Sequence, residues 1–230
     1  MRKYSEVTKE GRLTVITINR PEVMNALHHP ANIELSEAFD NFVSDPDQWV
    51  AIITGAGDKA FCAGNDLKYQ ASGGDMKGQP SSGFGGITSR FDNTKPIIAA
   101  VNGVAMGGGF EIALACDLIV AAENAVFSLA EPRVGLAALG GGIHRLPREI
   151  GIKKAMGMLL TGRRVSAQEG KDLGFVNEVS RKNSVLDTAK DWAGLILECA
   201  PLSVRASKEA AMLGMNASGI EEAIKSRYKQ

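Results

Sequence analysis

Val101-Asn102-Gly103-Val104-Ala105-Met106-Gly107-Gly108-Gly109-Phe110-Glu111 is the most informative stretch of the chain, because a predicted strand meets three glycines and then a predicted helix. The first N–H groups of a helix have no partner within it, and the helix dipole favours negative charge there. Glycine has no Cβ, so a ligand can approach such a backbone closely. The stretch is therefore a candidate oxyanion site, although an isolated triple glycine is more often a flexible turn with close strand–helix packing.

A second turn of the same kind is Phe61-Cys62-Ala63-Gly64-Asn65-Asp66-Leu67-Lys68, which also follows a predicted strand and opens a predicted helix. An oxyanion hole generally needs two convergent peptide donors. Two strand-to-helix turns with small residues at the bend offer such donors. The pair favours an oxyanion hole over two unrelated flexible turns.

Two glutamates accompany these turns. Glu111 falls in the first turn of the glycine-led helix, where a solvated charge is the ordinary explanation. It stands between Phe110 and the apolar run 112–116, so a partly buried carboxyl group with a raised pKa is the alternative. Glu131 comes just before Pro132. A helix, a returning strand and a hairpin between the two glutamates could bring them together, which spacing alone does not prove.

Short β-branched runs alternate with helical patterns over the first two-thirds of the chain, which predicts an α/β layered fold. Four apolar runs without alternation are typical of strands covered on both faces. Pro30 stands at the first position of a predicted helix, and the pattern after Pro147 is helical. The predicted strands are 13–18, 49–54, 95–101 and 117–122, and the later apolar helices are 152–160, 185–196 and 220–228.

Residues 71–86 are rich in glycine and serine and poor in apolar side chains, which predicts a mobile surface loop. The segment lies between two of the motifs above. A substrate-responsive lid and a passive surface loop are both consistent with this composition.

The overall composition, 44% hydrophobic and 23% charged, is that of an ordinary soluble globular protein. Basic and acidic residues balance at 26 each, so no net charge draws the chain to nucleic acid or to an anionic membrane. The N-terminus runs straight into a strand pattern, and no window approaches the roughly 20 apolar residues of a membrane span. We therefore expect a cytoplasmic protein with neither nucleic-acid nor membrane partners.

The three cysteines are far apart and have neither CxxC spacing nor companion histidines, so we expect reduced core residues. The three histidines lack the i, i+4 carboxylate or histidine partner of a metal site, so we expect loop or surface positions and no metal. These residues are Cys62, Cys116, Cys199, His28, His29 and His144.

Four motifs resemble, in order and spacing, the crotonase or enoyl-CoA hydratase/isomerase superfamily. They are Asn19-Arg20-Pro21 with Met24-Asn25-Ala26-Leu27, the block 61–67, the block 101–111, and Ala130-Glu131-Pro132-Arg133-Val134-Gly135-Leu136. The resemblance spans nearly the whole chain and is strongest to enoyl-CoA hydratases. It implies a crotonase-like spiral of ββα units with the acyl-CoA site at 1–195. It also implies a helical C-terminal trimerisation region at 196–230 that is shorter than in relatives.

The resemblance also implies the site residues. The peptide N–H groups of Asn65 and Gly108 stand at the positions of the oxyanion hole that polarises a thioester carbonyl and stabilises the enolate. Glu111 stands where one glutamate activates water, and Glu131 where the other supplies the Cα proton. Coenzyme A would enter as part of the substrate, with no separate cofactor. The chain would bind further copies of itself to form a homotrimer or a dimer of trimers. Substrate contacts are implied at Met24, Ala26, Ala63, Asp66, Leu67, Lys68, Val104, Gly107 and Leu139.

The pair of glutamates favours an enoyl-CoA hydratase, which adds water to a 2-enoyl-CoA in the syn sense. Isomerases, dehalogenases, decarboxylases and naphthoate synthases of the superfamily usually change one or both positions. Residues 136–142 replace the Pro-Gly turn of typical short-chain hydratases, and residues 130–133 also resemble carnitinyl-CoA dehydratase-like members. Carnitinyl-CoA dehydratase and enoyl-CoA isomerase activities are therefore alternatives, and the acyl group stays open.

Two functions of other classes compete with this prediction. Gly55-Ala56-Gly57 after a strand suggests a nicotinamide oxidoreductase, but residues 61–64 interrupt the pattern that a dinucleotide fingerprint requires. A non-catalytic RNA-binding or scaffold relative would need a basic, aromatic-studded stripe, which the zero net charge argues against.

Overall fold

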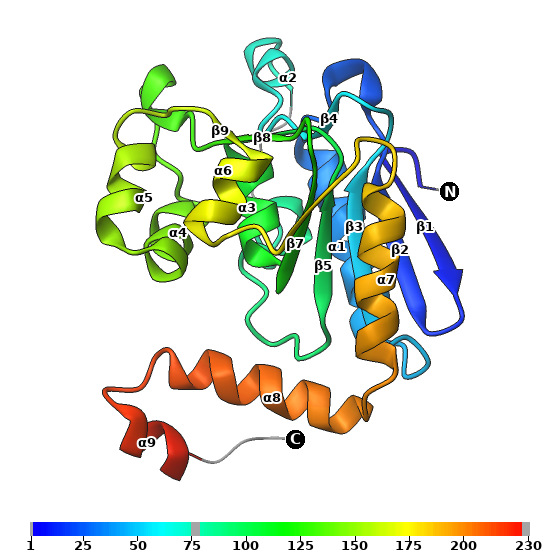
Figure 1. Cartoon of the computed structure of the whole chain (residues 1–230). Coiled ribbons are helices and arrows are strands. Elements are labelled where there is room, and N and C mark those ends of the chain that lie inside the picture. The colour runs from blue at the N-terminus through cyan, green and yellow to red at the C-terminus, as the bar shows by residue number, and fades with distance from the viewer. Residues whose placement is uncertain (1, 75–78, 227–230) are drawn as a thin grey trace.

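The computed structural model describes residues 2–74 and 79–226, which form two sheets of mostly parallel strands with helices around them (Figure 1). The larger sheet has the strand order β1-β2-β3-β5-β7-β10, and the smaller has the order β4-β6-β8-β9. The strands are β1 Ser5–Glu10, β2 Leu13–Ile18, β3 Val50–Gly55, β4 Ala60–Cys62, β5 Ile97–Val101, β6 Val104–Met106, β7 Leu118–Ala122, β8 Val126–Ser128, β9 Val165–Ser166 and β10 Glu178–Ser180.

The predicted spiral of ββα units is confirmed by the order of these strands. The first turn places both β1 and β2 in the larger sheet before α1. The next three turns each place one strand in the larger sheet and the following strand in the smaller sheet, and then make a helix before the chain returns. The helices are α1 His29–Ser44, α2 Leu67–Ala71, α3 Gly108–Ala115, α4 Gly142–Ile150, α5 Ile152–Leu159, α6 Ala167–Leu173, α7 Val185–Leu197, α8 Pro201–Gly214 and α9 Ile220–Lys225, with 3-10 turns η1 Pro21–Val23, η2 Phe84–Gly86 and η3 Glu131–Val134.

Both faces of the larger sheet are buried, as the absence of alternation predicts. Val15 and Ile52 point to the face that α7 covers, where they pack with Ala189 and Ala193. Their neighbours Ile16 and Ile53 point to the other face, into a core shared with α1 and α3. Each such buried aliphatic side chain contributes about 1.5–3 kcal/mol relative to exposure. Figure 1 shows α7 lying along one face of the sheet.

Two buried asparagines join successive units where the chain passes from one sheet to the other. Asn102 donates from Nδ2 to the carbonyls of Gly55 and Gly57, both at 2.8 Å, and accepts the N–H of Gly55. Asn25 donates to the carbonyls of Ala56 and Ala60 and accepts the N–H of Arg20.

The Gly55–Gly57 turn is thus a corner of the spiral that leads into β4. A dinucleotide fingerprint would require a helix there, so this structure contradicts the oxidoreductase alternative.

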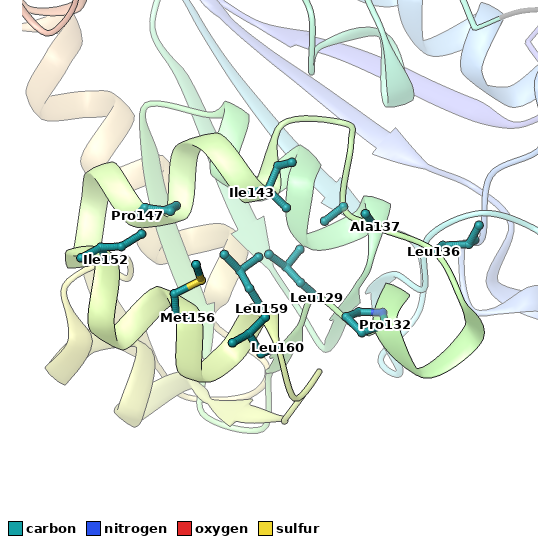
Figure 2. Close-up of a pocket in the computed structure, with 11 residues that line it drawn as sticks. Leu129, Pro132, Leu136, Ala137, Ile143, Pro147, Ile152, Met156, Leu159 and Leu160 are labelled. Atoms are coloured by element: carbon teal, nitrogen blue, oxygen red, sulfur yellow. The ribbon is translucent and has the colours of Figure 1, made fainter.

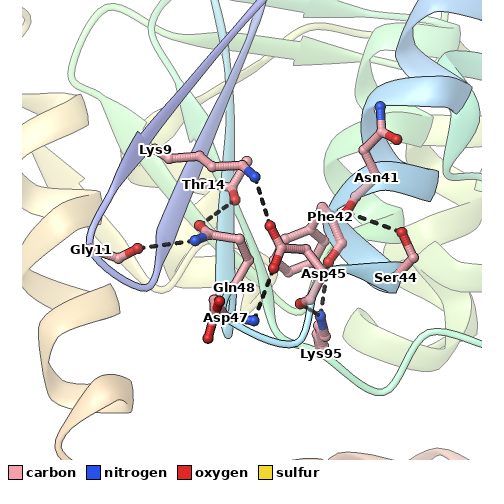
Figure 3. Close-up of polar contacts among 10 residues, drawn as sticks. All are labelled: Lys9, Gly11, Thr14, Asn41, Phe42, Ser44, Asp45, Asp47, Gln48 and Lys95. Carbon is pink, nitrogen blue, oxygen red and sulfur yellow. Dashed lines mark hydrogen bonds and ion pairs between the residues drawn. The ribbon is translucent and has the colours of Figure 1, made fainter.

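A polar cluster fixes the end of α1 against the β1–β2 turn (Figure 3). Lys95 donates from Nζ to the carbonyls of Phe42 and Asp45, which have no intrahelical partner at the end of a helix. The side chain of Gln48 accepts from Thr14 Oγ1 and donates to the carbonyl of Gly11. The cluster thereby satisfies buried polar groups on three separate segments.

The prediction of a mobile surface loop at 71–86 is wrong for residues 82–86, which are buried. Ala71 ends α2, and Phe84–Gly86 is a buried 3-10 turn on α1. The N–H of Gly85 donates to Asn32 Oδ1 at 2.7 Å, and the hydroxyls of Ser82 and Ser36 are 2.7 Å apart. These glycines serve close packing against a helix, which composition does not distinguish from a loop. Residues 75–78 lie outside the described residues.

Two smaller predictions also need correction. The helix α1 begins at His29, so Pro30 takes its second position and not its first. His28 lies in the loop before α1, as predicted, but it is buried, and its Nδ1 accepts the N–H of Ala31 as the helix cap. Cys62 is buried, but Cys199 is exposed and Cys116 intermediate, so only one cysteine is a core residue.

The C-terminal helices α8 and α9 extend from the end of α7 and have no buried residues (Figure 1). The domain boundary predicted after residue 195 falls in the last turn of α7, which packs on the sheet. The last predicted helix is present as α9, whereas Tyr228 lies outside the described residues. Over residues 2–74 and 79–226, the helices are too short or too polar to cross a membrane.

Candidate active site

The two strand-to-helix turns predicted as an oxyanion hole lie against each other. One joins β4 to α2 and the other joins β6 to α3, and β4 and β6 are neighbours in the smaller sheet. A Cβ on Gly64 would come within 2.7 Å of the carbonyl oxygen of Met106 and 3.3 Å of the N atom of Gly108. A Cβ on Gly109 would collide with the carbonyl of Cys62. Glycine is therefore required at both positions for the turns to approach this closely.

The peptide N–H groups of Asn65 and Gly108 are both directed away from the backbone ladder. Leu27 and Asn65 form a parallel bridge, in which Leu27 donates to the carbonyl of Gly64 and accepts the N–H of Asp66. In a parallel bridge, the N–H of the central residue points to the opposite side, so that of Asn65 faces away from Leu27. Gly108 is the first residue of α3, where an N–H has no intrahelical acceptor.

Glu111 is held in a cradle built by the turn before α4. Its side chain is on α3, and the residue is only 4% exposed. Oε1 accepts the N–H of Gly142 at 2.9 Å. A Cβ on Gly140 would come within 2.5 Å of Oε2, and one on Gly142 within 3.1 Å of the Glu111 Cγ. The absence of side chains at these two glycines lets the backbone close over the carboxyl group.

Glu131 opens the 3-10 turn η3, and this turn brings its carboxyl group back to the glycines of α3. A Cβ on Gly107, whose φ is +54°, would lie 2.9 Å from Glu131 Oε1. The N–H of Gly107 donates to the carbonyl of Ser128, which holds the end of β8 beside this glycine. Within the described ranges, Oε2 of Glu131 is buried without a hydrogen-bond partner. Such an orphan oxygen is expected where a substrate or water supplies the partner.

The electrostatic environment raises the pKa of both carboxyl groups. Burial raises the pKa of Glu111 to about 7, opposed by the hydrogen bond from Gly142 and reinforced by the charge of Glu131. Burial also raises the pKa of Glu131. Burial and the repulsion between the two carboxyl groups both favour the protonated form of Glu111. Over residues 2–74 and 79–226, there is no group of three or more His, Cys, Asp or Glu side chains that could hold a metal ion.

An internal ion pair fixes the position of the turn that contains Asn65. Arg20 Nη2 and Asp66 Oδ2 are 3.0 Å apart, and both side chains are almost completely buried. Asp66 Oδ1 also accepts the N–H of Tyr69 as the cap of α2, and Arg20 donates to the carbonyl of Ala26. The carboxylate of Asp66 is therefore engaged in holding the turn.

The structure places the nine implied substrate contacts in three groups. Met24 and Ala63 are directly joined, because the N–H of Ala63 donates to the Met24 carbonyl at 3.0 Å. Leu67 and Lys68 are exposed on α2, and Leu139 is 76% exposed between η3 and α4. The remaining four lie on the two turns, on β6, or on the segment before α1 that pairs with the Asn65 turn: Ala26, Asp66, Val104 and Gly107. Contact with substrate stays a prediction for all nine.

The sequence prediction misses the residues that surround Glu111 and Gly108. Gly140 and Gly142 form the cradle described above, and Arg145 lies near enough to lower the pKa of Glu111. The ring of Phe84 packs on Gly108, where a Cβ would approach it to 2.6 Å. A second run of three glycines opening a helix, at 140–142, is the signal that points to the cradle.

An apolar cavity of about 340 Å³ lies between η3, α4 and α5 (Figure 2). Pro132, which follows Glu131, forms part of its wall, and so does Ile143, which follows Gly142. The rest of the lining is also apolar and consists of Leu129, Leu136, Ala137, Ala138, Pro147, Ile152, Met156, Leu159 and Leu160. The cavity thus borders the turn that carries Glu131 and the helix α4, whose first glycine contacts Glu111.

A family model described as "Enoyl-CoA hydratase/isomerase" matches residues 8–228 of this chain. The chain belongs to this family. A "Carnitinyl-CoA dehydratase" from Salmonella enteritidis PT4 is 44% identical over 210 residues, which are 91% of this chain and 80% of that protein. The predicted family is therefore confirmed.

Solved structures of the enoyl-CoA hydratase/isomerase family share the whole fold. A carnitinyl-CoA dehydratase from Mycobacterium avium has a TM-score of 0.87 at 42% identity, over 97% of this chain and 87% of its own. An enoyl-CoA hydratase from Mycobacterium marinum has a TM-score of 0.89 at 38% identity, over 96% of this chain and 86% of its own. The crotonase-like α/β architecture predicted from the motifs is thus confirmed.

We predict that Glu111→Gln stabilises the protein at pH 8 but not at pH 5. When the pKa of a carboxyl group is raised in the folded state, the folded protein loses stability as the pH rises above the pKa that the group has in the unfolded chain. The loss is complete above the folded value of about 7. Glutamine carries no charge and can still accept the N–H of Gly142. The expected gain at pH 8 is about 3 kcal/mol in the free energy of unfolding by urea.

The matched control is Glu37→Gln, which neutralises an exposed glutamate on α1. It should change the unfolding free energy little at either pH. Equal unfolding free energies of wild type and Glu111→Gln at pH 8 would contradict the prediction, because the ionised Glu111 would then not destabilise the folded protein.

Proposed function

We propose that this protein is an enoyl-CoA hydratase that uses Glu111 and Glu131 to add water to a 2-enoyl-CoA thioester. The observation that carries the proposal is that the carboxyl group of Glu131 lies against Gly107 at the start of α3, close enough to the buried Glu111 for its charge to raise the pKa of Glu111. Burial raises the pKa of both carboxyl groups. Glu111, with a pKa of about 7, can accept and donate protons near neutral pH. The similarity to hydratases and dehydratases of the family supports the same class of reaction.

The N–H groups of Asn65 and Gly108 are proposed as the oxyanion hole for the thioester oxygen. Both are directed away from the backbone ladder, and the two turns that carry them are in contact. Negative charge that develops on the thioester oxygen as the enolate forms would be stabilised by fixed dipoles and by the N-terminus of α3. Because both donors are peptide groups, the side chain at position 65 is free to vary.

The two glutamates are proposed to divide the proton transfers. Ionised Glu111 takes a proton from water, whose oxygen bonds to Cβ while the π electrons move towards the thioester oxygen. Protonated Glu131 then gives its proton to Cα as the enolate collapses. After the addition, Glu111 is protonated and Glu131 is ionised. One proton exchange between the two glutamates restores the starting state. The two carboxyl groups titrate as a coupled pair, so these are roles in one microstate.

The substrate is proposed to be an acyl-CoA thioester, with coenzyme A brought in by the substrate and no separate cofactor. Proteins of this family act on CoA thioesters. The exposed Lys68 and Leu67 on α2 are suited to a large polar ligand at the surface, and Met24, Ala26 and Ala63 lie next to the Asn65 turn.

Dehydration of carnitinyl-CoA is the second candidate. It is favoured by 44% identity to a protein named carnitinyl-CoA dehydratase. A carnitinyl group carries a trimethylammonium cation, which proteins usually recognise by aromatic rings or carboxylates. The cavity beside η3 and α4 is instead lined by aliphatic side chains. This lining supports an uncharged acyl chain.

The decisive kinetic experiment measures hydration of crotonyl-CoA by the loss of its absorbance, and dehydration of carnitinyl-CoA in parallel. We expect kcat/KM for crotonyl-CoA to exceed that for carnitinyl-CoA. We expect Glu111→Gln and Glu131→Gln each to lower kcat by 10²–10⁴-fold, because each removes a proton-transfer group. The KM should change much less, since neither carboxyl group is proposed to hold coenzyme A.

Glu37→Gln again serves as the control and should keep wild-type kinetics. Full activity of either site variant would refute the assignment of that glutamate. Binding of coenzyme A without turnover of any enoyl-CoA would refute the hydratase and favour an isomerase or a non-catalytic relative.

A homotrimer or a dimer of trimers is proposed as the assembly. The helices α8 and α9 expose large apolar side chains over two elements that have no buried residues. Exposed apolar patches of this kind usually mark an interface. The side chains are Leu202, Met212, Leu213, Met215, Ile220 and Ile224.

We predict a mass of three or six times 24.4 kDa by sedimentation equilibrium. Replacing Leu213 and Ile224 by serine should lower the mass towards that of a single chain, because both side chains are exposed in the isolated chain. Substitution of the exposed Phe91, which is not on α8 or α9, should leave the assembly intact. A monomeric wild type would contradict the proposal.

A further inference from the structure

We propose that Arg145 is a positioning residue that holds the cradle of Glu111 and supplies its counter-charge. The inference rests on the proposed hydratase for its kinetic part only. Arg145 lies on α4, one turn after the glycines that enclose Glu111. It reaches two carbonyl groups that belong to different segments of the chain.

The guanidinium of Arg145 bridges the cradle to the segment after η2. Nη2 donates to the carbonyl of Thr88 at 2.9 Å, and Nη1 lies 3.5 Å from the carbonyl of Gly140, at the limit of a hydrogen bond. A Cβ on Gly141, whose φ is +112°, would collide with Nη1, so the guanidinium lies directly against this turn. The planar fork of arginine can reach two separated acceptors, whereas the single ammonium of lysine cannot hold both in this way.

The segment that Arg145 contacts also reaches the proposed oxyanion hole. Phe84 packs on Gly108, and Thr88 follows in the same segment and is buried. The backbone N–H of Thr88 donates to the carbonyl of Phe84. Arg145 therefore connects the wall beside Gly108 to the turn that holds Glu111. A shift of the arginine would disturb both halves of the site.

The positive charge of Arg145 opposes the groups that raise the pKa of Glu111. Burial and the ionised form of Glu131 raise the pKa of Glu111, whereas Arg145 lowers it. The groups that face Arg145 are Cys116, Glu149 and Glu111. Removal of the positive charge would leave Glu111 protonated up to a higher pH. The ionised base would then be scarce near neutral pH.

The test compares the pH dependence of kcat/KM for crotonyl-CoA in Arg145→Met, Arg145→Lys and wild type. In Arg145→Met, the acid limb of the profile, where kcat/KM rises with pH, should move to higher pH. At pH 6, kcat/KM of Arg145→Met should therefore be roughly tenfold lower than that of Arg145→Lys. Arg145→Lys keeps the charge and should keep the acid limb, but it should lower kcat because the bridge is lost. Arg148→Met is the control, since Arg148 is exposed on the same helix and donates to the carbonyl of His144.

A second measurement follows the carboxyl carbon of Glu111 by NMR in enzyme labelled with ¹³C-glutamate, assigned by its absence in Glu111→Gln. Its titration should move to higher pH in Arg145→Met and stay in place in Arg145→Lys and Arg148→Met. This readout needs no turnover, so it remains decisive even if the enzyme hydrates no enoyl-CoA.

An unmoved titration in Arg145→Met would overturn the electrostatic role. Wild-type kcat in Arg145→Lys would overturn the bridging role, and this variant tests the bridge even if Arg145→Met does not fold. A loss of kcat in Arg145→Met at all pH values, with the acid limb in place, would show a merely structural residue and would also refute the proposal.

Discussion

The buried carboxyl group of Glu111, with the half-buried Glu131 near enough to act on it, imposes the main constraint on this structure. Each would be solvated and ionised in water, and their proximity adds repulsion to the loss of hydration. The fold meets part of this cost by aiming the N–H of Gly142 at Glu111 and by placing Arg145 beside it. It leaves one oxygen of Glu131 buried without a partner in the described residues. What destabilises the isolated fold is therefore what raises the pKa of both carboxyl groups.

The same constraint explains where glycine is required. Gly107 leaves room for the carboxyl group of Glu131, and Gly140 leaves room for that of Glu111. Gly64 and Gly109 let the turns after β4 and β6 touch, which brings the segments that contain Asn65 and Gly108 together. The spiral of ββα units supplies this contact, since successive units place β4 and β6 side by side and begin a helix after each. Site and fold thus depend on the same small residues.

Much of this arrangement could be predicted from the sequence, but not all of it. The long buried strands β2, β3, β5 and β7 follow from continuous apolar runs, whereas the short strands of the smaller sheet give too weak a pattern. The motifs identify both glutamates and both glycine turns, because each is local in sequence. The cradle at Gly140 and Gly142, and the contact of Phe84 with Gly108, are tertiary contacts between distant segments. Residues 82–86 are misjudged for the same reason, since their glycines pack against α1 and do not form a loop.

Hydration of crotonyl-CoA in D₂O, with the configuration at Cα and Cβ of the product read by NMR, tests the central claim most directly. If Glu111 and Glu131 hold one water over one face of the double bond, oxygen and deuterium must add to the same face. The account predicts a single diastereomer from syn addition. A mixture of diastereomers, or anti addition, would contradict it, because the two carboxyl groups would then not act together from one face.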